Sequence, residues 1–293
     1  MKKVLVIGGA GFIGSHTADE LSNEGYQVTI FDCEESPWLR DDQKIIIGNI
    51  LDKDMVEESI KGMDIVYHFA GMADIGEASR RPYDTVYSNV MGTTTVLQAC
   101  ATGGIKRFIY ASTVYVYSPF GSFYRASKQA AENIIEAYAE RYQIRYTLLR
   151  YGSLYGPRSQ KWNGLRNWVT QAIIDKTIDY RGTGQERREY IHVIDAAKLS
   201  VRVLDKKYEN SAVTITGTQV LTSKELLEMI QEICGEKINI SYKEEYDFNY
   251  HYISTPYRYT PKVAKKLTPE EFVDLGQGIL ELVEEISESV RLK

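Results

Sequence analysis

The stretch VLVIGGAGFIGSH (residues 4–16) decides the fold, because it joins an apolar run to a helical pattern through three evenly spaced glycines. Gly8 permits a tight turn, Gly11 lets backbone approach a pyrophosphate, and Gly14 lets the helix pack on the sheet. The start of the helix would then face the negative phosphates. Asp32 ends the next apolar run, about twenty residues on, where this motif places an acid. The stretch therefore predicts a dinucleotide-binding strand–turn–helix unit.

Asp32 also indicates which dinucleotide is bound. Its carboxylate can accept hydrogen bonds from the adenosine ribose, and its charge would repel a 2′-phosphate. No arginine adjoins it in the sequence. The pattern favours NAD over NADP, and the alternative is that Asp32 only caps a helix or a turn.

Further along the chain, short apolar runs alternate with helical patterns up to about residue 152. The runs cover 3–8, 27–32, 45–49, 65–70, 107–112 and 146–151, and the helical patterns cover 12–24, 53–61, 82–102 and 124–142. Continuous apolar strands separated by helices are typical of a parallel sheet with both faces covered. We therefore predict an α/β fold with a Rossmann-like, doubly wound parallel sheet.

The alternation weakens after residue 152. Helices are expected over 165–175 and 223–234, a strand over 213–216, and a final amphipathic helix over 269–290. We expect residues 1–152 to form an NAD-binding Rossmann domain, completed by a returning segment near 185–218. Residues 153–293 would then form mainly a smaller α/β substrate-binding lobe.

Composition excludes several classes of partner. A net charge of −5 and a pI near 5.6 argue against binding to nucleic acid or to a membrane surface. No apolar run approaches the length of a membrane span. Cys33, Cys100 and Cys234 are far apart and form no metal-binding or disulfide pattern. We expect no metal, and a cytoplasmic location.

A tyrosine–lysine pair is the main catalytic candidate. Tyr124 and Lys128 are four residues apart in a helical pattern, which places them on one face. A free tyrosine is only about one part in a thousand ionised at pH 7, but a neighbouring ammonium stabilises its phenolate. Such a pair is usually a solvated helix face; the glycine turn upstream favours catalysis here.

Seven stretches in order resemble the extended short-chain dehydrogenase/reductases of the NAD-dependent epimerase/dehydratase family, typified by UDP-galactose epimerases. They are GGAGFIGSH (8–16), HFAG (68–71), NVMGTTTVLQAC (89–100), FIYASTVYVY (108–117), YRASK (124–128), LRYGSLYGPR (149–158) and GTGQERREYIHVIDAA (182–197). The resemblance covers nearly the whole chain.

The resemblance implies site residues. Tyr124 would be the catalytic acid or base, Lys128 its partner and a ligand of the nicotinamide ribose, and Thr113 a hydroxyl that bonds the reacting sugar oxygen. Tyr110, Tyr115 and Tyr117 would only pack. The implied cofactor residues are Gly8, Gly11, Phe12, Ile13, Gly14, Asp32, Asn49, Ile50, Ala70, Gly71, Asn89, Tyr124, Lys128 and Tyr151. Asn49 stands where the family usually has an aspartate, and Asn89 has a capping or core role as its alternative.

Substrate residues are implied in the same way. Arg188 matches an arginine that binds the diphosphate of a nucleotide-sugar, with Arg187 able to share the role and a surface ion pair as the alternative. Ser153 stands where many relatives have an asparagine. Trp162, Asn163 and Arg166 would line the nucleotide pocket or pack a helix, and His192 would be structural.

The implied reaction is epimerisation through transient oxidation of a sugar hydroxyl at carbon 4, a step in carbohydrate biosynthesis. Dehydratases and decarboxylases of the family carry carboxylates just after the Thr113 position, where this chain has Val114 and Tyr115. A nucleotide-sugar dehydrogenase, reductase or dehydratase is the alternative, and a non-catalytic NAD-binding regulator a further one. The short loop between Tyr117 and Tyr124 suggests a more open sugar pocket, or a sugar of unusual shape. Helices 82–102 and 124–142 would pair in a homodimer.

Overall fold

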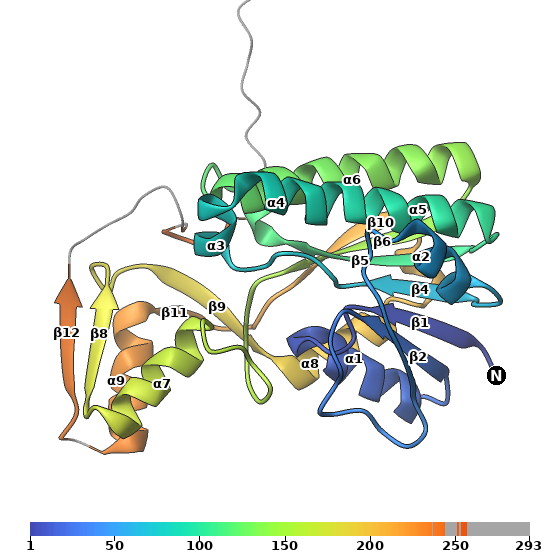
Figure 1. Cartoon of the computed structure of the whole chain (residues 1–293). Helices are drawn as coiled ribbons and strands as arrows, with labels where there is room; N and C mark the ends of the chain where they lie inside the picture. Colours follow the sequence, from blue (N-terminus) through green and yellow to red (C-terminus); the bar gives the residue numbers. More distant parts are fainter. Residues whose placement is uncertain (236, 244–250, 252, 257–293) are drawn as a thin grey trace, which may run out of the picture. The chain divides into compact units, whose positions relative to one another are not determined.

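A parallel seven-stranded sheet runs through the first 215 residues (Figure 1). The computed structural model describes residues 1–235, 237–243, 251 and 253–256. The strands are β1 (Lys3–Ile7), β2 (Gln27–Asp32), β3 (Lys44–Ile47), β4 (Ile65–His68), β5 (Arg107–Thr113), β6 (Arg145–Tyr151) and β10 (Ser211–Ile215). Their order is β10-β6-β5-β4-β1-β2-β3, and every neighbouring pair is parallel. β4 and β5 are buried throughout because helices cover both faces.

Two groups of helices cover the two faces of this sheet (Figure 1). On one face, α1 (Phe12–Asn23) packs with α8 (Val193–Arg202), and Leu21 and Ala196 join a buried cluster with strand residues. On the other lie α2 (Lys53–Ile60), α5 (Gly92–Thr102) and α6 (Ser122–Tyr142), which bury Ile60 and Ile135. The sheet is therefore doubly wound, and the predicted fold class is confirmed.

The helix expected over 82–102 is interrupted. It consists of α4 (Pro82–Val86), a π-helical turn η1 (Tyr87–Met91) and α5, and α3 (Ile75–Arg80) precedes it. A π-helical turn re-aims side chains within an otherwise α-helical segment. Here Asn89, on the turn, is buried.

The remaining described residues form a second group of elements. β7 (Ser153–Tyr155), β9 (Arg187–His192) and β11 (Val220–Thr222) make a three-stranded sheet, and β8 (Thr177–Arg181) pairs with β12 (Asn239–Lys243). α7 (Gly164–Ile174) and α9 (Ser223–Cys234) pack on one another around a separate core that includes Ile178 and Leu227. Within the part of the chain that the structure describes, η2 (Val114–Tyr117) and η3 (Lys206–Tyr208) are short 3-10 turns.

The returning segment divides between the two parts. β10 is a strand of the seven-stranded sheet, and α8 packs on that sheet. β9 belongs to the three-stranded sheet, although it also lies within the expected 185–218 segment. The division into domains at residue 152 stays a prediction. The helix expected over 269–290 lies outside the described residues.

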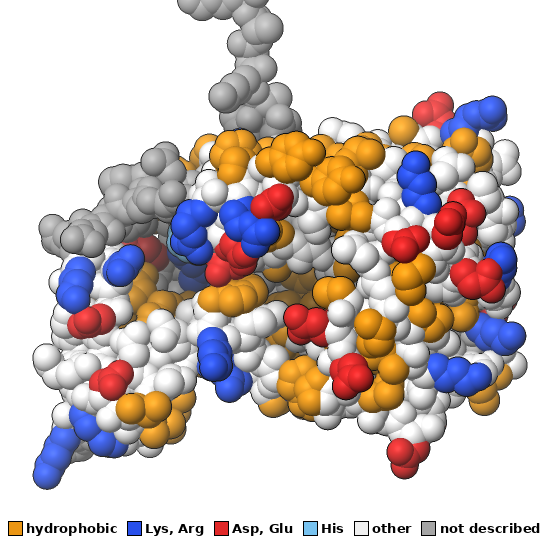
Figure 2. Space-filling model, in the orientation of Figure 1, with side chains coloured by type: hydrophobic (Ala, Val, Ile, Leu, Met, Phe, Trp, Pro, Cys, Tyr) orange, Lys and Arg blue, Asp and Glu red, His pale blue; other side chains and the backbone are white. Residues whose placement is uncertain are grey.

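Apolar side chains gather on the surface over α4 and the neighbouring helices (Figure 2). Tyr83, Tyr87 and Met91 are among them, and Tyr83 is 75% exposed. Among the helices that the structure describes, none has both the length and the apolar character needed to span a bilayer.

Candidate active site

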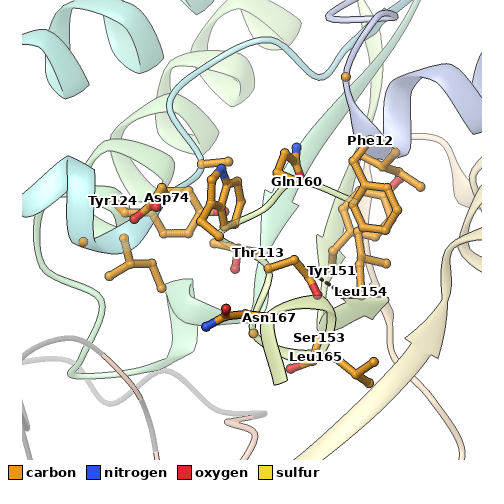
Figure 3. Close-up of a pocket in the computed structure, with 18 of the residues that line it drawn as sticks. Phe12, Asp74, Thr113, Tyr124, Tyr151, Ser153, Leu154, Gln160, Leu165 and Asn167 are labelled. Atoms are coloured by element: carbon orange, nitrogen blue, oxygen red, sulfur yellow. Dashed lines mark hydrogen bonds between the residues drawn. The ribbon is translucent and has the colours of Figure 1, made fainter. Parts of the chain in front are cut away.

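A cleft of about 2050 Å³ opens at the carboxyl ends of β1, β2, β4, β5 and β6 and continues along the second group of elements. Open parallel sheets bind ligands at this edge. Typical ligand pockets measure roughly 300–1,000 Å³, so this cleft has room for two ligands side by side. Figure 3 shows part of its lining, including Phe12, Thr113, Tyr124 and Tyr151.

The glycine turn forms one wall of the cleft. Gly8 has φ +84°, and a Cβ atom there would lie 2.4 Å from the backbone nitrogen of Ala70. A Cβ at Gly14 would lie 2.1 Å from the carbonyl oxygen of Gly8, so only glycine allows α1 to approach the turn this closely. Gly11 caps α1, leaving the first amides of the helix without a side-chain cap. These amides suit an anionic diphosphate.

Asp32 lies beside this turn at the end of β2. One of its carboxylate oxygens accepts a hydrogen bond from the backbone N–H of Ala10 (2.9 Å), which ties the turn to the acid. Glu34 and Glu35 also line the cleft here. Three acidic side chains in this corner fit a ribose diol and disfavour a 2′-phosphate. The residues present therefore fit NAD.

Tyr124 and Lys128 lie in the first two turns of α6. The helix starts after Gly121, whose φ of +102° lets the chain turn sharply out of η2. Tyr124 is half-buried, and its ring meets that of Tyr115 edge to face with centroids 6.1 Å apart. Lys128 is 5% exposed, and its Nζ donates to the carbonyl of Ala111 (2.8 Å). Both line the cleft.

The pKa of Lys128 is set by two opposing effects. Burial lowers the pKa of its ammonium to about 8, and the Glu132 carboxylate one turn further along α6 opposes this shift. The ammonium also lies 4.7 Å from the centre of the Tyr110 ring. Lys128 is therefore a buried cation that gives up its proton more readily than a surface lysine does.

A buried network holds α6 against the sheet behind these residues. The Arg150 guanidinium bonds both carboxylate oxygens of Glu132, the shorter contact being 2.6 Å, and Ser112 donates to the same carboxylate. Arg150 also donates to the hydroxyl of Tyr117 (2.6 Å). Tyr117 thus has a structural role, as expected, and a bidentate ion pair fixes the helix that carries Tyr124 and Lys128.

Thr113 ends β5 and is 4% exposed. Its hydroxyl accepts a hydrogen bond from the backbone N–H of Tyr115 (3.2 Å). Thr113, Tyr124 and Lys128 all line the cleft. The structure therefore brings the three predicted catalytic residues to one site, with the glycine turn in the same cleft.

The predicted substrate residues come from the second group of elements. Ser153 on β7 and Arg188 on β9 line the cleft. Tyr151 lines it too, although its hydroxyl is bonded to Ser200. Trp162 and Asn163 also line it, and Asn163 caps α7 by accepting from the N–H of Arg166.

His192 lies apart from this lining. Its side chain accepts from the N–H of Ile194 at the start of α8, which fits the structural role expected for it.

The structure does not bring three predicted cofactor residues to the cleft wall. Asn49 is exposed and accepts from the N–H of Leu51, while Ile50 belongs to the hydrophobic core. Asn89 is 1% exposed, and its amide bonds the backbone of Met72 and the hydroxyl of Ser127. This arrangement matches the core alternative for Asn89. Direct contact of these three with the cofactor stays a prediction.

Two residues of the cleft escaped sequence reasoning. Tyr115 packs, as expected, in a buried cluster with Ile75 and Val114, and it also lines the cleft beside Tyr124. Its hydroxyl is hydrogen-bonded to Nδ1 of His251 (2.7 Å), which also lines the cleft. No local motif marks His251, because its partner lies 136 residues earlier in the chain.

A doubly wound sheet, a glycine turn for a diphosphate and a tyrosine–lysine pair in one cleft define an NAD-binding enzyme of the short-chain dehydrogenase/reductase type. The family model described as "NAD dependent epimerase/dehydratase family" matches residues 4–215. The chain belongs to this family. The predicted family and NAD as cofactor are confirmed.

Curated relatives include more than one activity. A UDP-glucose 4-epimerase of Rhizobium meliloti is 30% identical over 285 residues, covering 82% of this chain and 84% of that protein. A mouse dTDP-D-glucose 4,6-dehydratase is 27% identical over 267 residues, covering 80% of this chain and 75% of that protein. The family thus leaves the reaction to be argued from the site.

Among solved structures, a UDP-glucose 4-epimerase of Thermotoga maritima with UDP-glucose is 25% identical, with a TM-score of 0.80. The match covers 98% of this chain and 99% of that one. The expected epimerase activity agrees with these relatives.

Proposed function

We propose that this protein is an NAD-dependent nucleotide-sugar epimerase that acts by transient oxidation of the hydroxyl at carbon 4. One observation carries the proposal: Tyr124, Lys128 and Thr113 line the same cleft as the glycine turn. One cleft could therefore hold a sugar hydroxyl at Tyr124 and a dinucleotide whose diphosphate is bound by the amides after Gly11. Bound NAD supplies a hydride acceptor that can later return the hydride.

The protein's own residues handle the proton and the orientation. Tyr124 takes the proton of the sugar hydroxyl, and the Lys128 ammonium, one helical turn away, favours the charged phenolate during the transfer. Thr113, at the end of β5, offers a hydroxyl to the same sugar oxygen. Arg188, from the other side of the cleft, binds the diphosphate of the nucleotide-sugar through its permanently charged guanidinium.

The oxidised sugar would then have to turn over in the cleft, so that its opposite face is the one reduced. The cleft volume of about 2050 Å³ supports this step. If Arg188 keeps hold of the diphosphate, the sugar can rotate while the nucleotide stays bound. Tyr124 gives its proton back, and no net oxidation results.

Two features weigh against a dehydratase and against a non-catalytic regulator, and the third alternative is left to experiment. A dehydratase needs a base for the carbon-5 proton, and the positions after Thr113 hold a buried valine and Tyr115, whose hydroxyl is bonded to His251. A non-catalytic NAD-binding regulator has no need of a buried lysine four residues after a cleft tyrosine. A nucleotide-sugar dehydrogenase or reductase would keep the same residues and consume its cofactor.

Mass spectrometry of the purified protein, followed by turnover of UDP-glucose and UDP-galactose, tests the proposal. We expect bound NAD, interconversion without added cofactor, and no solvent deuterium in the product. Solvent deuterium at carbon 5 would indicate elimination, and consumption of added NAD would indicate a dehydrogenase.

The variant Tyr124→Phe removes only the hydroxyl and should lower kcat by about 100- to 10,000-fold while NAD stays bound. Tyr142→Phe, at the far end of α6 and 42% exposed, is the matched control and should be unchanged. Full turnover in Tyr124→Phe would contradict the proposal.

We also propose a homodimer formed through α4, η1 and α6. Support comes from the exposed apolar side chains on α4 and η1, which are Tyr83, Val86, Tyr87 and Met91, with the rings of Tyr83 and Tyr87 stacked. Figure 2 shows apolar side chains gathered over this part of the surface. Such a patch suits a protein partner. Light scattering of wild type and Tyr87→Glu tests it, with a monomeric variant expected.

A cytoplasmic location is proposed as well. Its support is that all three cysteines are free, as a reducing compartment allows. Fractionation of cells that express the protein tests this location.

A further inference from the structure

A tryptophan lines the cofactor side of the cleft, although no sequence motif marks it. Trp38 belongs to the loop that follows Asp32, and both residues line the cleft together with Pro37. Asn49 and Ile50, the predicted cofactor residues after β3, do not line it. Trp38 therefore brings an aromatic ring into the cleft from the loop that begins at Asp32, the acid that fits the adenosine ribose.

The loop that carries Trp38 is fixed to α1. Arg40 Nη1 donates to the side-chain oxygen of Asn23 at the end of this helix (2.7 Å). Gln43 is buried, and its amide donates to Oδ1 of Asp19, also on α1 (3.2 Å). The first amides of α1 are the ones that suit a diphosphate. The loop is therefore held in place relative to the predicted diphosphate site.

Arg158 ties the same loop to the segment that follows β7. Its guanidinium lies over the Trp38 ring, 5.4 Å from the ring centroid. Its Nη1 forms an ion pair with Oδ2 of Asp19 at 2.8 Å. Each side chain of this ion pair is only 21% exposed, so salt screens it less than a pair on the open surface. Trp38 and Asp19 therefore hold the Arg158 guanidinium between them.

The backbone of Arg158 is strained. Its φ is +65°, a left-handed conformation that is uncommon for residues other than glycine. Such a conformation persists only where the surrounding contacts enforce it. One such contact precedes it, because Nε2 of His16 on α1 lies 3.0 Å from the carbonyl oxygen of Pro157. The position of Arg158 is therefore determined from the cofactor side of the cleft.

Arg158 approaches the Trp38 ring from outside the cleft. Trp38 lines the cleft, whereas Arg158 does not. The Trp38 side chain is still 36% exposed, so part of the indole surface remains open to a ligand. An indole held in this way offers the cleft a flat apolar surface in a fixed orientation. Nucleic-acid bases, of which adenine is one, stack on such surfaces.

We propose that Trp38 is a cofactor-retaining residue whose indole covers the adenosine half of bound NAD, and that Arg158 and Asp19 position it. The inference needs bound NAD, but it does not need the epimerase reaction. Retention suits the proposed function, because an epimerase oxidises and reduces its substrate with the same NAD. Loss of the cofactor between the two steps would leave the reaction incomplete. Trp38 contacts the cofactor, and Arg158 acts through Trp38.

The experiment measures how fast bound NAD exchanges with an excess of NAD labelled in its adenine. Trp38→Leu removes the flat ring and keeps an apolar side chain. It should speed exchange by about 10- to 100-fold, the usual effect of losing one stack between a base and an aromatic ring. Trp38→Phe keeps an aromatic ring and should stay within about threefold of wild type.

Binding of ADP-ribose shows which half of the cofactor is affected. This molecule contains the adenosine and the diphosphate of NAD but no nicotinamide. Calorimetry on protein stripped of NAD should give a Kd for ADP-ribose that rises in Trp38→Leu by the same factor as the Kd for NAD. An unchanged Kd for ADP-ribose would contradict a contact with the adenosine half.

A double-mutant cycle tests the positioning role of Arg158. Arg158→Gln keeps most of the length of the side chain and removes its charge, and it should speed NAD exchange by about 2- to 10-fold. In the Trp38→Leu background the same change should have no further effect, because Arg158 acts through the ring. A merely structural role would instead speed exchange equally in both backgrounds.

Leu39→Ala is the matched control for Trp38→Leu. Leu39 is the next residue of the same loop, is 39% exposed and does not line the cleft. Its variant should exchange NAD as wild type does, and urea midpoints should show that all variants stay folded. Unchanged exchange in Trp38→Leu, or equal acceleration in Leu39→Ala, would overturn the inference. Turnover of nucleotide-sugars is measured separately, so failure of the epimerase proposal would leave this result unaffected.

Discussion

On the cofactor side of the cleft, a local turn with three glycines brings backbone to the wall, whereas on the substrate side the lining comes from segments far apart in the chain. Gly8, Gly11 and Gly14 lie within seven residues and act by having no side chain. Tyr115 and His251, or Arg188 and Ile253, meet only because the chain returns. We therefore expect substitutions in the glycine turn to be poorly tolerated. On the substrate side, a single substitution should remove one contact and leave the others in place.

The sharpest test of this contrast compares two glycines with positive φ. Gly8→Ala would place a Cβ 2.4 Å from the Ala70 nitrogen, whereas Gly25, with φ +80°, has open space at that position. Gly25→Ala should cost about 1–2 kcal/mol of unfolding free energy from backbone strain alone. Gly8→Ala should cost about 1–3 kcal/mol more through overpacking, and should lose NAD binding.

Urea unfolding and NAD titration check both glycine variants. Equal stability of the two, with NAD still bound to Gly8→Ala, would show that the turn is less confined than the structure indicates.

The same contrast explains what sequence could predict. The cofactor half was predictable because each strand and the glycine turn carry local, periodic signals, and the six predicted strands appear within about two residues. The contact between Tyr115 and His251 could not be predicted, because the two residues lie 136 positions apart and no spacing encodes it. The short strands β7, β9 and β11 pair across long separations and carry too few residues for a periodic signal.

On the substrate side, two neighbouring arginines offer the next test. Arg188 lines the cleft, whereas Arg187 is exposed and does not. Arg188→Ala should raise KM for a nucleotide-sugar by about 10- to 100-fold, as expected for a lost charged hydrogen bond. Arg187→Ala is the matched control, and steady-state kinetics with unchanged NAD affinity give the readout. Equal increases in KM would indicate that the two arginines attract the substrate only through their overall positive charge, without a specific contact from Arg188.

The smallest expected effect is the pH dependence caused by Lys128, which lies between the cofactor side and the substrate side of the cleft. With its pKa lowered to about 8, the protonated fraction falls about fourfold between pH 7 and 8.5, and kcat/KM should follow. Stability should change in the opposite direction. The unfolded chain, where the lysine pKa is near 10.5, binds more protons between pH 8 and 10.5, so this group makes folding more favourable as pH rises.

Parallel pH series of kcat/KM and of the urea midpoint separate these two effects of Lys128. A midpoint that falls together with activity above pH 8 would assign the loss to unfolding.

The position of β10 at the outer edge of the seven-stranded sheet has a consequence for how the molecule is made. Residues 211–215 pair with β6, and α8, from 193–202, packs against α1. During synthesis β6 therefore pairs only with β5, and its other edge stays unpaired until β7, β8 and β9 of the other half and then β10 have been made. The two halves cannot mature one after the other, and any break in the chain near residue 152 separates a sheet from its own last strand.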